Sequence, residues 1–452
     1  MKTVVVVGAG PAGLFAAQKI ARAGHPVIIL NRDIKPGGLA EYGIYPVKEK
    51  MKGGLRKQFA KILGLPNVNY FGHIPIGRGY SLSIEELREL NPAALVFAVG
   101  AQGTKKLGLP GEDARGVYSA KDFVFFYNQL PPFTSRDFST GKRVVIVGMG
   151  NVMVDIARWL LQDDPLHSAE EVFVVARRGP FEAKFDQKEM DHIEMHLDLD
   201  DLRAELLRVK PGIAGVGHDI SKVPDNIFPI LARTGTKQIK PKFKFRFLCS
   251  PKEIVPDAAG RIAKLVMTEN ILVPKGDGTA AKATDKTTDL EVDTMIFAIG
   301  DTADPQVGLP FSKDSYVTNP DSSAGEGTAY EVFDPAAGKV LQGTYVVGWA
   351  RKASEGLVGV ARFDAEKGAD HVLRYLEGAA DRVTPSAEEM ARMFAKRNLR
   401  VVDKADLAFL GRAEAEQAKA RGLASFKFAE NQKMLAVIEE EKTKGAAIPA
   451  DD

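Results

Sequence analysis

Short apolar runs alternate with helical patterns along the first part of this chain. Residues Val4–Val7 and Val27–Leu30 are apolar throughout, and residues 14–23 between them place apolar side chains at helical spacing. Such runs, bounded by glycine or polar residues, are typical of strands buried on both faces. The other elements expected in this part are a strand at 94–99 and helices at 51–63 and 83–90. The pattern predicts an α/β unit with a doubly wound parallel sheet.

The same order of elements recurs further along the chain. Strands are expected at 143–147 and 172–176, with a helix at 152–162 between them, and a later strand at 294–299 closes the unit. The repeat predicts a second α/β unit of the same kind. The remaining expectations are a strand pair within 254–270, a polar loop at 274–289, a strand at 341–347 and helices from residue 386 onward.

The first strand-to-helix junction carries the sequence GAGPAG, with glycine at positions 8, 10 and 13. In a dinucleotide-binding unit the first glycine allows the tight turn, the second lets a pyrophosphate approach, and the third lets helix and strand pack closely. The start of the helix then offers unpaired N–H groups to the phosphates. The alternative is a tight turn without a ligand.

The second junction has Gly148 and Gly150, but Met153 stands where the third glycine is expected. After the next strand comes Arg177-Arg178, where an NAD-binding unit commonly has an acid. Two guanidinium groups suit a 2′-phosphate, which favours NADP while NAD stays possible. The alternative is a solvated basic loop. At the first unit the matching residue is Asn31, which suits a ribose better than a phosphate.

Composition excludes several classes of function. A chain of 452 residues is expected to form about two to three domains, and a net charge of +2 gives no case for nucleic acid. The single cysteine, Cys249, excludes an internal disulfide, a redox cysteine pair and a cysteine-held iron–sulfur centre. No metal site and no membrane span are expected, and the N-terminal strand leaves no room for a signal peptide, so a cytoplasmic location is expected.

Three further stretches carry candidate chemistry. Residues 35–46, glycine-rich and aromatic, are expected to be an ordered loop against a ligand, or else a surface loop. The basic run 233–246 contains no acid and suits an acidic partner, or else is a solvated face. Trp349 and the segment 356–360 are similar to the flavin-covering end of many flavoproteins, although Trp349 also suits a core aromatic.

The motifs of the chain occur in one order: GAGPAG, GLAEYGIYP, AVG, LGLPGED, VVIVGMGNVMVDIAR, VARRGP, FRFLCSP, AIG, VVGWAR and EGLVG. In this order they resemble the adrenodoxin reductase family of ferredoxin–NADP reductases, flavoproteins of the glutathione-reductase type. The similarity runs over nearly the whole chain and includes the C-terminal stretch 403–422. The GLAEYGIYP segment is also similar to the small-subunit reductases of glutamate synthase, which normally carry a cysteine-rich domain that this chain lacks.

The resemblance implies an α/β protein with two Rossmann-like dinucleotide-binding domains. The expected boundaries are 1–107 and 336–385 for the FAD-binding domain, 108–335 for an inserted NAD(P)-binding domain, and 386–452 for a helical C-terminal extension. The resemblance implies that one set of residues binds FAD: Gly8, Gly10, Pro11, Ala12, Gly13, Asn31, Arg32, Gly38, Leu39, Ile74, Gly100, Gly348, Trp349, Gly356, Leu357 and Val358. It implies that a second set binds the nicotinamide nucleotide: Met149, Gly150, Asn151, Val152, Arg177, Arg178 and Glu189. The implied catalytic residues are Trp349, against the flavin, and Asp155, an acid near it.

The implied function is that of an FAD-dependent NAD(P)H oxidoreductase, which exchanges a hydride with the nicotinamide and passes electrons singly to ferredoxin or another iron–sulfur protein. Two alternatives stay open: an NAD(P)-reducing FAD subunit of a larger redox complex whose partners carry the clusters, and a flavin-containing scaffold without turnover. Two positions depart from the family. Asn31 stands where members usually have Glu, and Lys48 stands where the mitochondrial and mycobacterial members have His.

Overall fold

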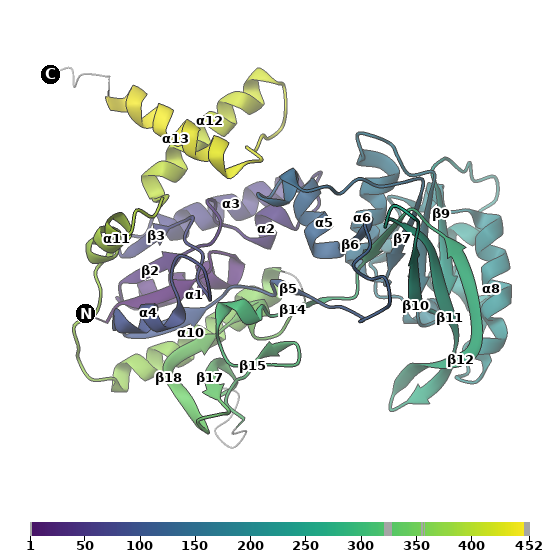
Figure 1. Ribbon diagram of the computed structural model, residues 1–452, viewed down its shortest axis with the longest axis horizontal. Helices are drawn as coiled ribbons and strands as arrows, with labels where there is room; N and C mark the ends of the chain where they lie inside the picture. The colour runs from purple at the N-terminus through teal and green to yellow at the C-terminus, as the bar shows by residue number, and fades with distance from the viewer. Residues whose placement is uncertain (1, 321–327, 354–355, 357, 447–452) are drawn as a thin grey trace. The chain divides into compact units, whose positions relative to one another are not determined.

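The structure is a computed structural model that describes residues 2–320, 328–353, 356 and 358–446. The chain folds into two compact α/β units, which are labelled by element in Figure 1. Unit 1 comprises Met1–Lys105, Phe125–Ser135 and Gly300–Asp452, and unit 2 comprises Lys106–Val124 and Arg136–Ile299.

Unit 1 is built on a six-stranded sheet with the order β17-β18-β4-β1-β2-β3. Its strands are β1 (Val4–Val7), β2 (Val27–Leu30), β3 (Val68–Phe71), β4 (Ala94–Phe97), β17 (Glu331–Asp334) and β18 (Lys339–Val346). Neighbouring strands are parallel except β17 and β18, which are antiparallel. The carboxyl ends of β1, β2 and β4 therefore lie together, at the edge where open α/β sheets bind ligands.

Helices cover both faces of this sheet, which explains why β1 and β2 are apolar at every position. Alternate side chains of β1 enter two separate cores, with Val4 and Val6 in one and Val5 and Val7 in the other. The first core is shared with α1 (Pro11–Arg22), α3 (Glu49–Leu63) and α10 (Val358–Gly378), and the second with α4 (Ile84–Glu89) and α11 (Ala387–Lys396).

The C-terminal helices α12 (Lys404–Ala420) and α13 (Asn431–Ala446) belong to unit 1. They enclose a small core with Ile34, which lies just after β2. The backbone of Val402 also bonds to Gly72 in both directions, at 2.8 and 3.1 Å. The segment expected as a helical C-terminal extension is therefore joined to the end of the sheet by packing and by backbone hydrogen bonds.

The unit boundaries differ from the expected domain boundaries. The chain returns to unit 1 at Gly300 rather than at residue 336, because β14 (Asp301–Thr302) pairs with β5 (Gly103–Thr104). Residues 125–135 also join unit 1. The short elements of unit 1 are α2 (Leu39–Tyr42), β15 (Phe311–Ser312) and β16 (Ser315–Tyr316), and α5 (Ala120–Tyr127) crosses the boundary.

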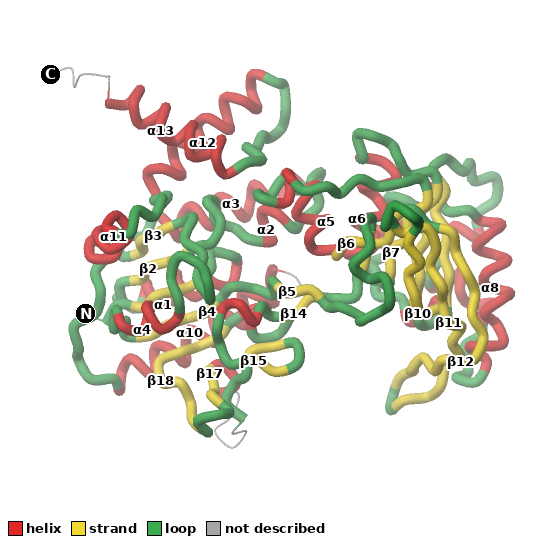
Figure 2. Tube along the Cα trace, in the orientation of Figure 1, coloured by secondary structure: helices red, strands yellow, loops and turns green. Residues whose placement is uncertain are grey.

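Unit 2 contains a five-stranded parallel sheet with the order β6-β13-β7-β8-β9 and an antiparallel sheet with the order β10-β11-β12. The parallel strands are β6 (Val117–Ser119), β7 (Arg143–Val147), β8 (Glu171–Ala176), β9 (Lys242–Phe247) and β13 (Thr294–Phe297); the antiparallel strands are β10 (Cys249–Pro256), β11 (Ile262–Lys275) and β12 (Gly278–Glu291). The helices are α6 (Asn151–Arg158), α7 (Gln187–Met190), α8 (Leu199–Ala214) and α9 (Val223–Asn226). Side chains of β7 and β8 share one core with β10 and β11, so the antiparallel sheet covers one face of the parallel sheet (Figure 2).

Two strands of unit 2 correct the sequence analysis. The stretch expected as a polar loop at 274–289 forms most of β12, which pairs with β11 as far as the tip at Lys275↔Gly278. Its polar residues suit the edge strand of a sheet that has one exposed face. The basic run was likewise not predicted to contain β9, in which Phe243, Phe245 and Phe247 are fully buried between charged neighbours.

Hydropathy adds one finding. Among the described residues, no helix is both long and apolar enough to cross a lipid bilayer.

Candidate dinucleotide-binding sites

The first candidate site is the turn between β1 and α1, at residues 8–13. Gly8 has a φ of +105°, and a Cβ there would lie 2.5 Å from the carbonyl oxygen of Ala98. A Cβ on Gly13 would lie 1.9 Å from the carbonyl oxygen of Gly8. Only glycine fits at either position, because both contacts are with backbone atoms that have no room to shift.

The middle glycine of this turn borders open space. A Cβ on Gly10 would meet no atom within 4 Å. Gly10 is the N-cap of α1 and Pro11 is its first residue, and no side chain caps the helix or places an acid in its first turn. The N–H groups at this helix start and the positive end of its dipole therefore suit an anion. The donors and the space fit the pyrophosphate of a dinucleotide.

Asn31, at the end of β2, faces the protein rather than open space. Its side chain is 8% exposed, its Oδ1 accepts from the N–H of Ala9 at 2.9 Å, and its Nδ2 donates to the carbonyls of Asp33 and Lys35 at 2.8 and 3.1 Å. Asn31 therefore supports the glycine turn through the N–H of Ala9, and its expected contact with a ribose stays a prediction. The next residue, Arg32, is 42% exposed and pairs with Asp33 at 3.0 Å.

The glycine-rich loop at 35–46 packs directly on the turn. The N–H of Gly37 donates to the carbonyl of Ala9 at 2.7 Å, and a Cβ on Gly38 would lie 3.1 Å from the Cα of Gly10. Leu39 then begins the short helix α2 and is half-buried. The structure therefore brings the expected residues Gly38 and Leu39 beside the first turn.

The returning segment after β18 reaches the same turn from the other side. A Cβ on Gly348 would lie 2.5 Å from the Cβ of Ala12 in α1. The N–H of Gly348 donates to the carboxylate of Asp364 at 2.6 Å, and Arg351 pairs with that same carboxylate. Asp364 was not predicted from the sequence, although it fixes Gly348 against the turn. Trp349 is half-buried in the short helical turn Gly348–Ala350.

The other residues expected around the flavin are placed as follows. Ile74 is 0% exposed within a hydrophobic core, and its expected contact with the cofactor stays a prediction. Gly100, with a φ of +71°, follows β4 at the carboxyl end of the sheet. Val358 begins α10 and is half-buried, and Gly356 is exposed. Leu357 lies outside the described residues.

A cluster of charges lies behind the loop. Glu41 is 3% exposed and accepts two bonds from Arg56, at 2.7 and 2.9 Å. Lys427 comes from the segment between α12 and α13 and lies 3.3 Å from the same carboxylate, while Lys35 pairs with Glu414 of α12. Burial alone would raise the pKa of Glu41, but the bonds from Arg56 and the charges of Lys35 and Lys427 lower it to about 2. The C-terminal helices are therefore tied to the loop that covers the turn.

A buried lysine extends this cluster. Lys52 of α3 is 1% exposed and donates to Oδ1 of Asn128 at 2.8 Å. Burial and the charge of Lys427 lower its pKa to about 7, although Glu41 and Glu49 oppose the change. No sequence motif marks these residues, because the contacts join segments that are far apart in the chain.

The second candidate site is the turn between β7 and α6. Gly148 has a φ of +121°, and a Cβ there would lie 2.3 Å from the carbonyl oxygen of Ala298. A Cβ on Gly150 would meet no atom within 4 Å, as at Gly10. Met153, in place of a third glycine, is 0% exposed. The second turn thus keeps the open middle glycine but holds its helix through a buried side chain.

The segment after β8 returns to this turn. The N–H of Lys184 donates to the carbonyl of Met149 at 2.9 Å, and the N–H of Asp186 donates to Oδ1 of Asn151 at 2.6 Å. Val152 is 49% exposed on the first turn of α6. Glu189 lies half-buried in α7, three residues beyond Asp186. The expected nucleotide residues Met149 and Asn151 are therefore in contact with the segment that follows the arginine pair.

The arginine pair itself is unusual among the arginines of unit 2. Arg177 is exposed and Arg178 half-buried, and neither guanidinium forms a hydrogen bond or ion pair with the described part of the chain. They follow β8 directly, and the N–H of Gly148 donates to the carbonyl of Val175 in that strand at 3.0 Å. Two uncompensated cations next to an open glycine turn fit a phosphate.

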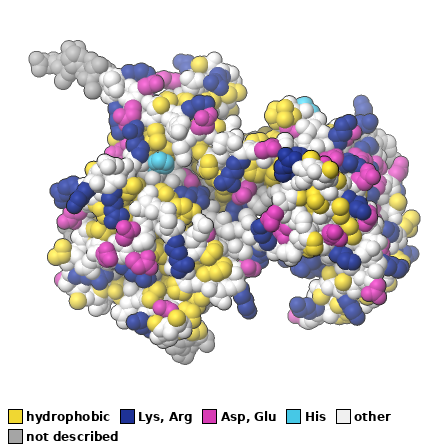
Figure 3. Space-filling view, in the orientation of Figure 1, with side chains coloured by type: hydrophobic (Ala, Val, Ile, Leu, Met, Phe, Trp, Pro, Cys, Tyr) yellow, Lys and Arg dark blue, Asp and Glu magenta, His cyan; other side chains and the backbone are white. Residues whose placement is uncertain are grey.

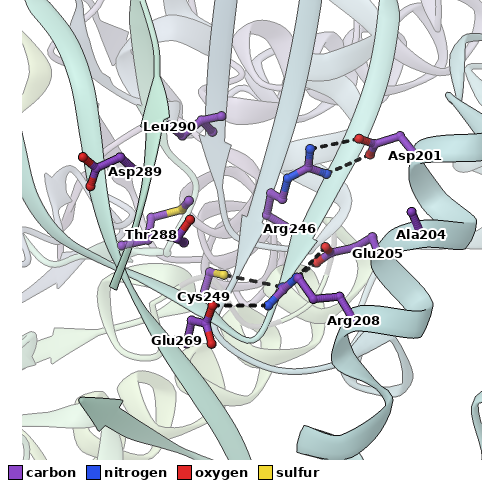
Figure 4. Close-up of a pocket in the computed structure, with 11 residues that line it drawn as sticks. Asp201, Ala204, Glu205, Arg208, Arg246, Cys249, Glu269, Thr288, Asp289 and Leu290 are labelled. Carbon is purple, nitrogen blue, oxygen red and sulfur yellow. Dashed lines mark hydrogen bonds and ion pairs between the residues drawn. The ribbon is translucent and has the colours of Figure 1, made fainter. Parts of the chain in front are cut away.

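A surface pocket between α8 and the antiparallel sheet shows the opposite arrangement (Figure 4). Arg246 pairs with Asp201 at 2.8 Å, and Arg208 pairs with Glu205 at 2.7 Å. Burial raises the pKa of the Cys249 thiol there to about 11, so this cysteine is not an activated nucleophile. The positive charge in this pocket is compensated by carboxylates, and the pocket does not suit a phosphate.

The basic run at 233–246 is compensated in the same way. Carboxylates from other elements pair with its cations: Arg233 with Glu194, Lys244 with Glu171, and Arg246 with Asp201. On the face shown in Figure 3, cationic and anionic side chains are interspersed. The fold therefore supplies acids that the run itself lacks and compensates part of its charge, and docking of an acidic partner here stays a prediction.

The two residues expected to be catalytic lie in different units. Asp155 is half-buried in α6 of unit 2, one turn after Asn151, and Trp349 belongs to unit 1. Each lies beside the candidate turn of its own unit. Their catalytic roles stay predictions.

Comparisons with known proteins agree with this arrangement. The family model for pyridine nucleotide-disulphide oxidoreductases matches residues 2–217. The NADPH-ferredoxin reductase FprA of Mycobacterium leprae is 30% identical over 93% of this chain and 94% of the relative. The mitochondrial NADPH:adrenodoxin oxidoreductase of Arabidopsis thaliana is 29% identical over 80% of both chains.

A solved structure is similar over nearly the full length. The structure of Mycobacterium tuberculosis FprA in complex with NADPH superposes with a TM-score of 0.81 and 28% sequence identity. The match covers 97% of this chain and 99% of that chain. The similarity therefore includes both units and the C-terminal helices.

Proposed function

Since this chain belongs to the family of the NADPH-ferredoxin reductases and NADPH:adrenodoxin oxidoreductases, we propose that it moves electrons between NADP(H) and an iron–sulfur protein such as ferredoxin. It is an FAD-dependent oxidoreductase with two Rossmann-like dinucleotide-binding domains. The bound nucleotides supply the hydride and single-electron chemistry, and the protein supplies binding, orientation and electrostatics.

In unit 1 the chain's own residues would hold FAD. The N–H groups at the start of α1 would bind the pyrophosphate beside Gly10, while Asn31 fixes the backbone of Ala9. Asp364 holds the backbone of Gly348, and because Gly348 has no side chain, this backbone can lie close to the first turn of α1. The loop at 35–46 would shield the cofactor from water.

In unit 2 the turn at Gly150 would bind the phosphates of NADP(H), and Arg177 and Arg178 would bind the 2′-phosphate. One observation carries this assignment: the two arginines have no partner among the described residues, although Arg208 and Arg246 nearby are paired. An ordered cation without an internal partner is available to an external anion.

Reduction of the flavin with NADPH and NADH in parallel tests this proposal. The parent protein is expected to prefer NADPH, and the double substitution Arg177→Ala with Arg178→Ala should lower the second-order rate with NADPH by about 100-fold and with NADH by less than twofold, because each charge-assisted bond contributes ~1.5–3 kcal/mol. Arg203→Ala is the matched control, since Arg203 is 51% exposed and pairs with Asp200. A parent protein that uses NADH better than NADPH would contradict the assignment.

Gel filtration of native extract separates a free-standing reductase from a subunit of a larger redox complex. A lone species at 49.0 kDa that reduces ferredoxin supports the free-standing enzyme. Co-elution with proteins that carry iron–sulfur clusters would favour the complex. Bleaching of the flavin absorbance by NADPH would eliminate a scaffold without turnover.

A further inference from the structure

The backbone of the arginine pair lies just beyond the sheet that orders the rest of the unit. The last pair between β8 and β9 joins Ala176 to Phe247. After it, the carbonyl of Arg178 accepts from the N–H of Leu248 at 3.2 Å, and the carbonyl of Arg177 accepts from the side-chain amide of Asn270 at 3.0 Å. The position of the pair therefore depends on groups outside the parallel sheet.

The side chain of Asn270 is held beside the arginine pair by burial and by several hydrogen bonds. It is 6% exposed, and its backbone N–H donates to the carbonyl of Leu248 at 2.7 Å. Its Nδ2 donates to Arg177 and also to the hydroxyl of Ser250 at 2.8 Å, so two acceptors use the two amide hydrogens. The pairing of β11 with β12 shifts register between Thr268 and Asn270. A bulge of this kind redirects a side chain out of the regular alternation of a strand.

The chemistry of the contact requires a donor. A carbonyl oxygen accepts hydrogen bonds only, so the amide of asparagine is suitable and a carboxylate of the same shape would be repelled. Alanine would leave the carbonyl of Arg177 without this partner. An arginine side chain loses rotational freedom when it binds an anion, and this loss lowers the affinity. A backbone that is already fixed leaves fewer conformations to be lost, so the entropy cost of binding is smaller.

We propose that Asn270 is a positioning residue for Arg177 and Arg178, and that it sets the preference for adenine nucleotides that carry a 2′-phosphate. This inference rests on the proposed function of the arginine pair. Asn270 reaches the pair from the antiparallel sheet. That sheet therefore contributes to nucleotide selectivity. Asn270 itself does not contact the nucleotide and acts by holding the backbone of the arginines.

Equilibrium binding to the flavin-loaded protein tests this proposal without relying on turnover. The probes are adenosine 2′,5′-bisphosphate, which carries the 2′-phosphate, and 5′-AMP, which lacks it. Asn270→Ala is expected to weaken binding of the bisphosphate by about tenfold and of 5′-AMP by less than twofold, because one buried hydrogen bond is lost at the arginine backbone. Asn270→Asp, which keeps the shape but replaces the amide donor with a negatively charged acceptor, should weaken the bisphosphate at least as much.

Ser250→Ala is the matched control, because it removes the other acceptor of the same amide and leaves the bond to Arg177. It should bind both probes within about twofold of the parent. In the background of the double substitution Arg177→Ala with Arg178→Ala, Asn270→Ala should have no further effect on the bisphosphate, as expected for residues that act through one another.

Equal weakening of both probes by Asn270→Ala and Asn270→Asp would show a merely structural role and overturn the proposal, and so would no change in either probe. Should the alanine variant not fold, the aspartate variant decides between the same outcomes. A different result tests the proposed function itself: if Arg177→Ala and Arg178→Ala leave both affinities unchanged, the 2′-phosphate assignment fails whatever Asn270 does.

Discussion

The turn at residues 8–13 and the turn at residues 148–153 meet their sheets in the same way but hold their helices differently. The first glycine of each has a positive φ and lies against a carbonyl, that of Ala98 in one unit and Ala298 in the other. At the third position, Gly13 brings α1 into direct contact with the turn, whereas Met153 fills the matching space with a buried side chain. The turn is therefore the shared part, and the helix contact is free to vary.

The side chains around the two turns differ in a second way. Around the first turn, the polar groups of Asn31 and Glu41 are buried, that of Asp364 is half-buried, and all three are bonded to other parts of the protein. Beside the second turn, Arg177 and Arg178 are accessible and unpaired within the described chain. The first arrangement suits a cofactor that stays bound, and the second suits a nucleotide that exchanges.

The largest expected effect tests the helix contact in unit 1. Gly13→Ala places a Cβ against the carbonyl of Gly8, and we expect a loss of about 3 kcal/mol or more of folding stability together with loss of FAD, because neither backbone segment has room to move. Thermal unfolding and flavin content measure it. Gly10→Ala is the control: it should keep the fold and lower only the affinity for FAD. If Gly13→Ala unfolded at the same temperature as the parent protein, the proposed difference in helix packing between the two turns would be wrong.

The reciprocal change tests unit 2. Met153→Ala leaves a cavity behind α6, and the expected loss is about 2–5 kcal/mol of unfolding free energy. Urea unfolding, followed by NADP⁺ binding, measures it, and the flavin content should stay at the parent level because unit 1 is unchanged. Val152→Ala is the control, since Val152 is 49% exposed and should change stability by less than about 0.5 kcal/mol.

A smaller effect is expected where the C-terminal helices meet the loop over the first turn. Lys427→Met leaves Glu41 bonded to Arg56 but removes a cation that also donates to the carbonyl of Asn128 at 3.0 Å. We expect FAD to dissociate about three- to tenfold faster, which corresponds to ~1 kcal/mol. Lys433→Met is the control, because Lys433 is 63% exposed and pairs with Glu430. Equal FAD release by both variants would show that the C-terminal helices do not support the site.

The last expected effect is a dependence of the unfolding free energy on pH in unit 1. Burial lowers the pKa of Lys52 to about 7, well below its value of about 10.4 in an unfolded chain, with Lys427, Arg56, Glu41 and Glu49 as its charged neighbours. Between these values the unfolded chain binds more protons, so stability should rise with pH by about 1 kcal/mol per unit above pH 7. Lys52→Met should flatten this rise, which denaturation at pH 7, 8 and 9 measures. A parallel rise in both proteins would assign it to other groups.

Much of the fold could be predicted because the parallel strands are buried on both faces. Val4–Val7 and residues 144–147 are therefore recognisable as apolar runs. The helix expected at 83–90 is present as α4, where Ser83 and Glu86 form a capping box. β9 was missed because its buried phenylalanines alternate with cations, which draws attention to charge rather than to period. β12 was missed because an edge strand needs few apolar residues.

The glycine turns could be predicted from local spacing, but their supports could not. Asn270 reaches Arg177 across 93 residues of sequence, and Lys427 reaches Glu41 across 386. Pairs of this kind leave no periodic pattern, since each partner is fixed by tertiary packing. Ile74, to which the family resemblance assigns a site role, lies enclosed in the core, and that role stays a prediction.

The ion pair between Lys35 and Glu414 has a consequence for how the protein is made. The two residues are 379 positions apart, and a ribosome that adds about 5–20 residues per second needs roughly 20–80 s to pass from one to the other. During that interval the nascent N-terminal turn exists without its last support. A flavin captured early in translation would be held more loosely than one captured after chain release, when the final helices have docked.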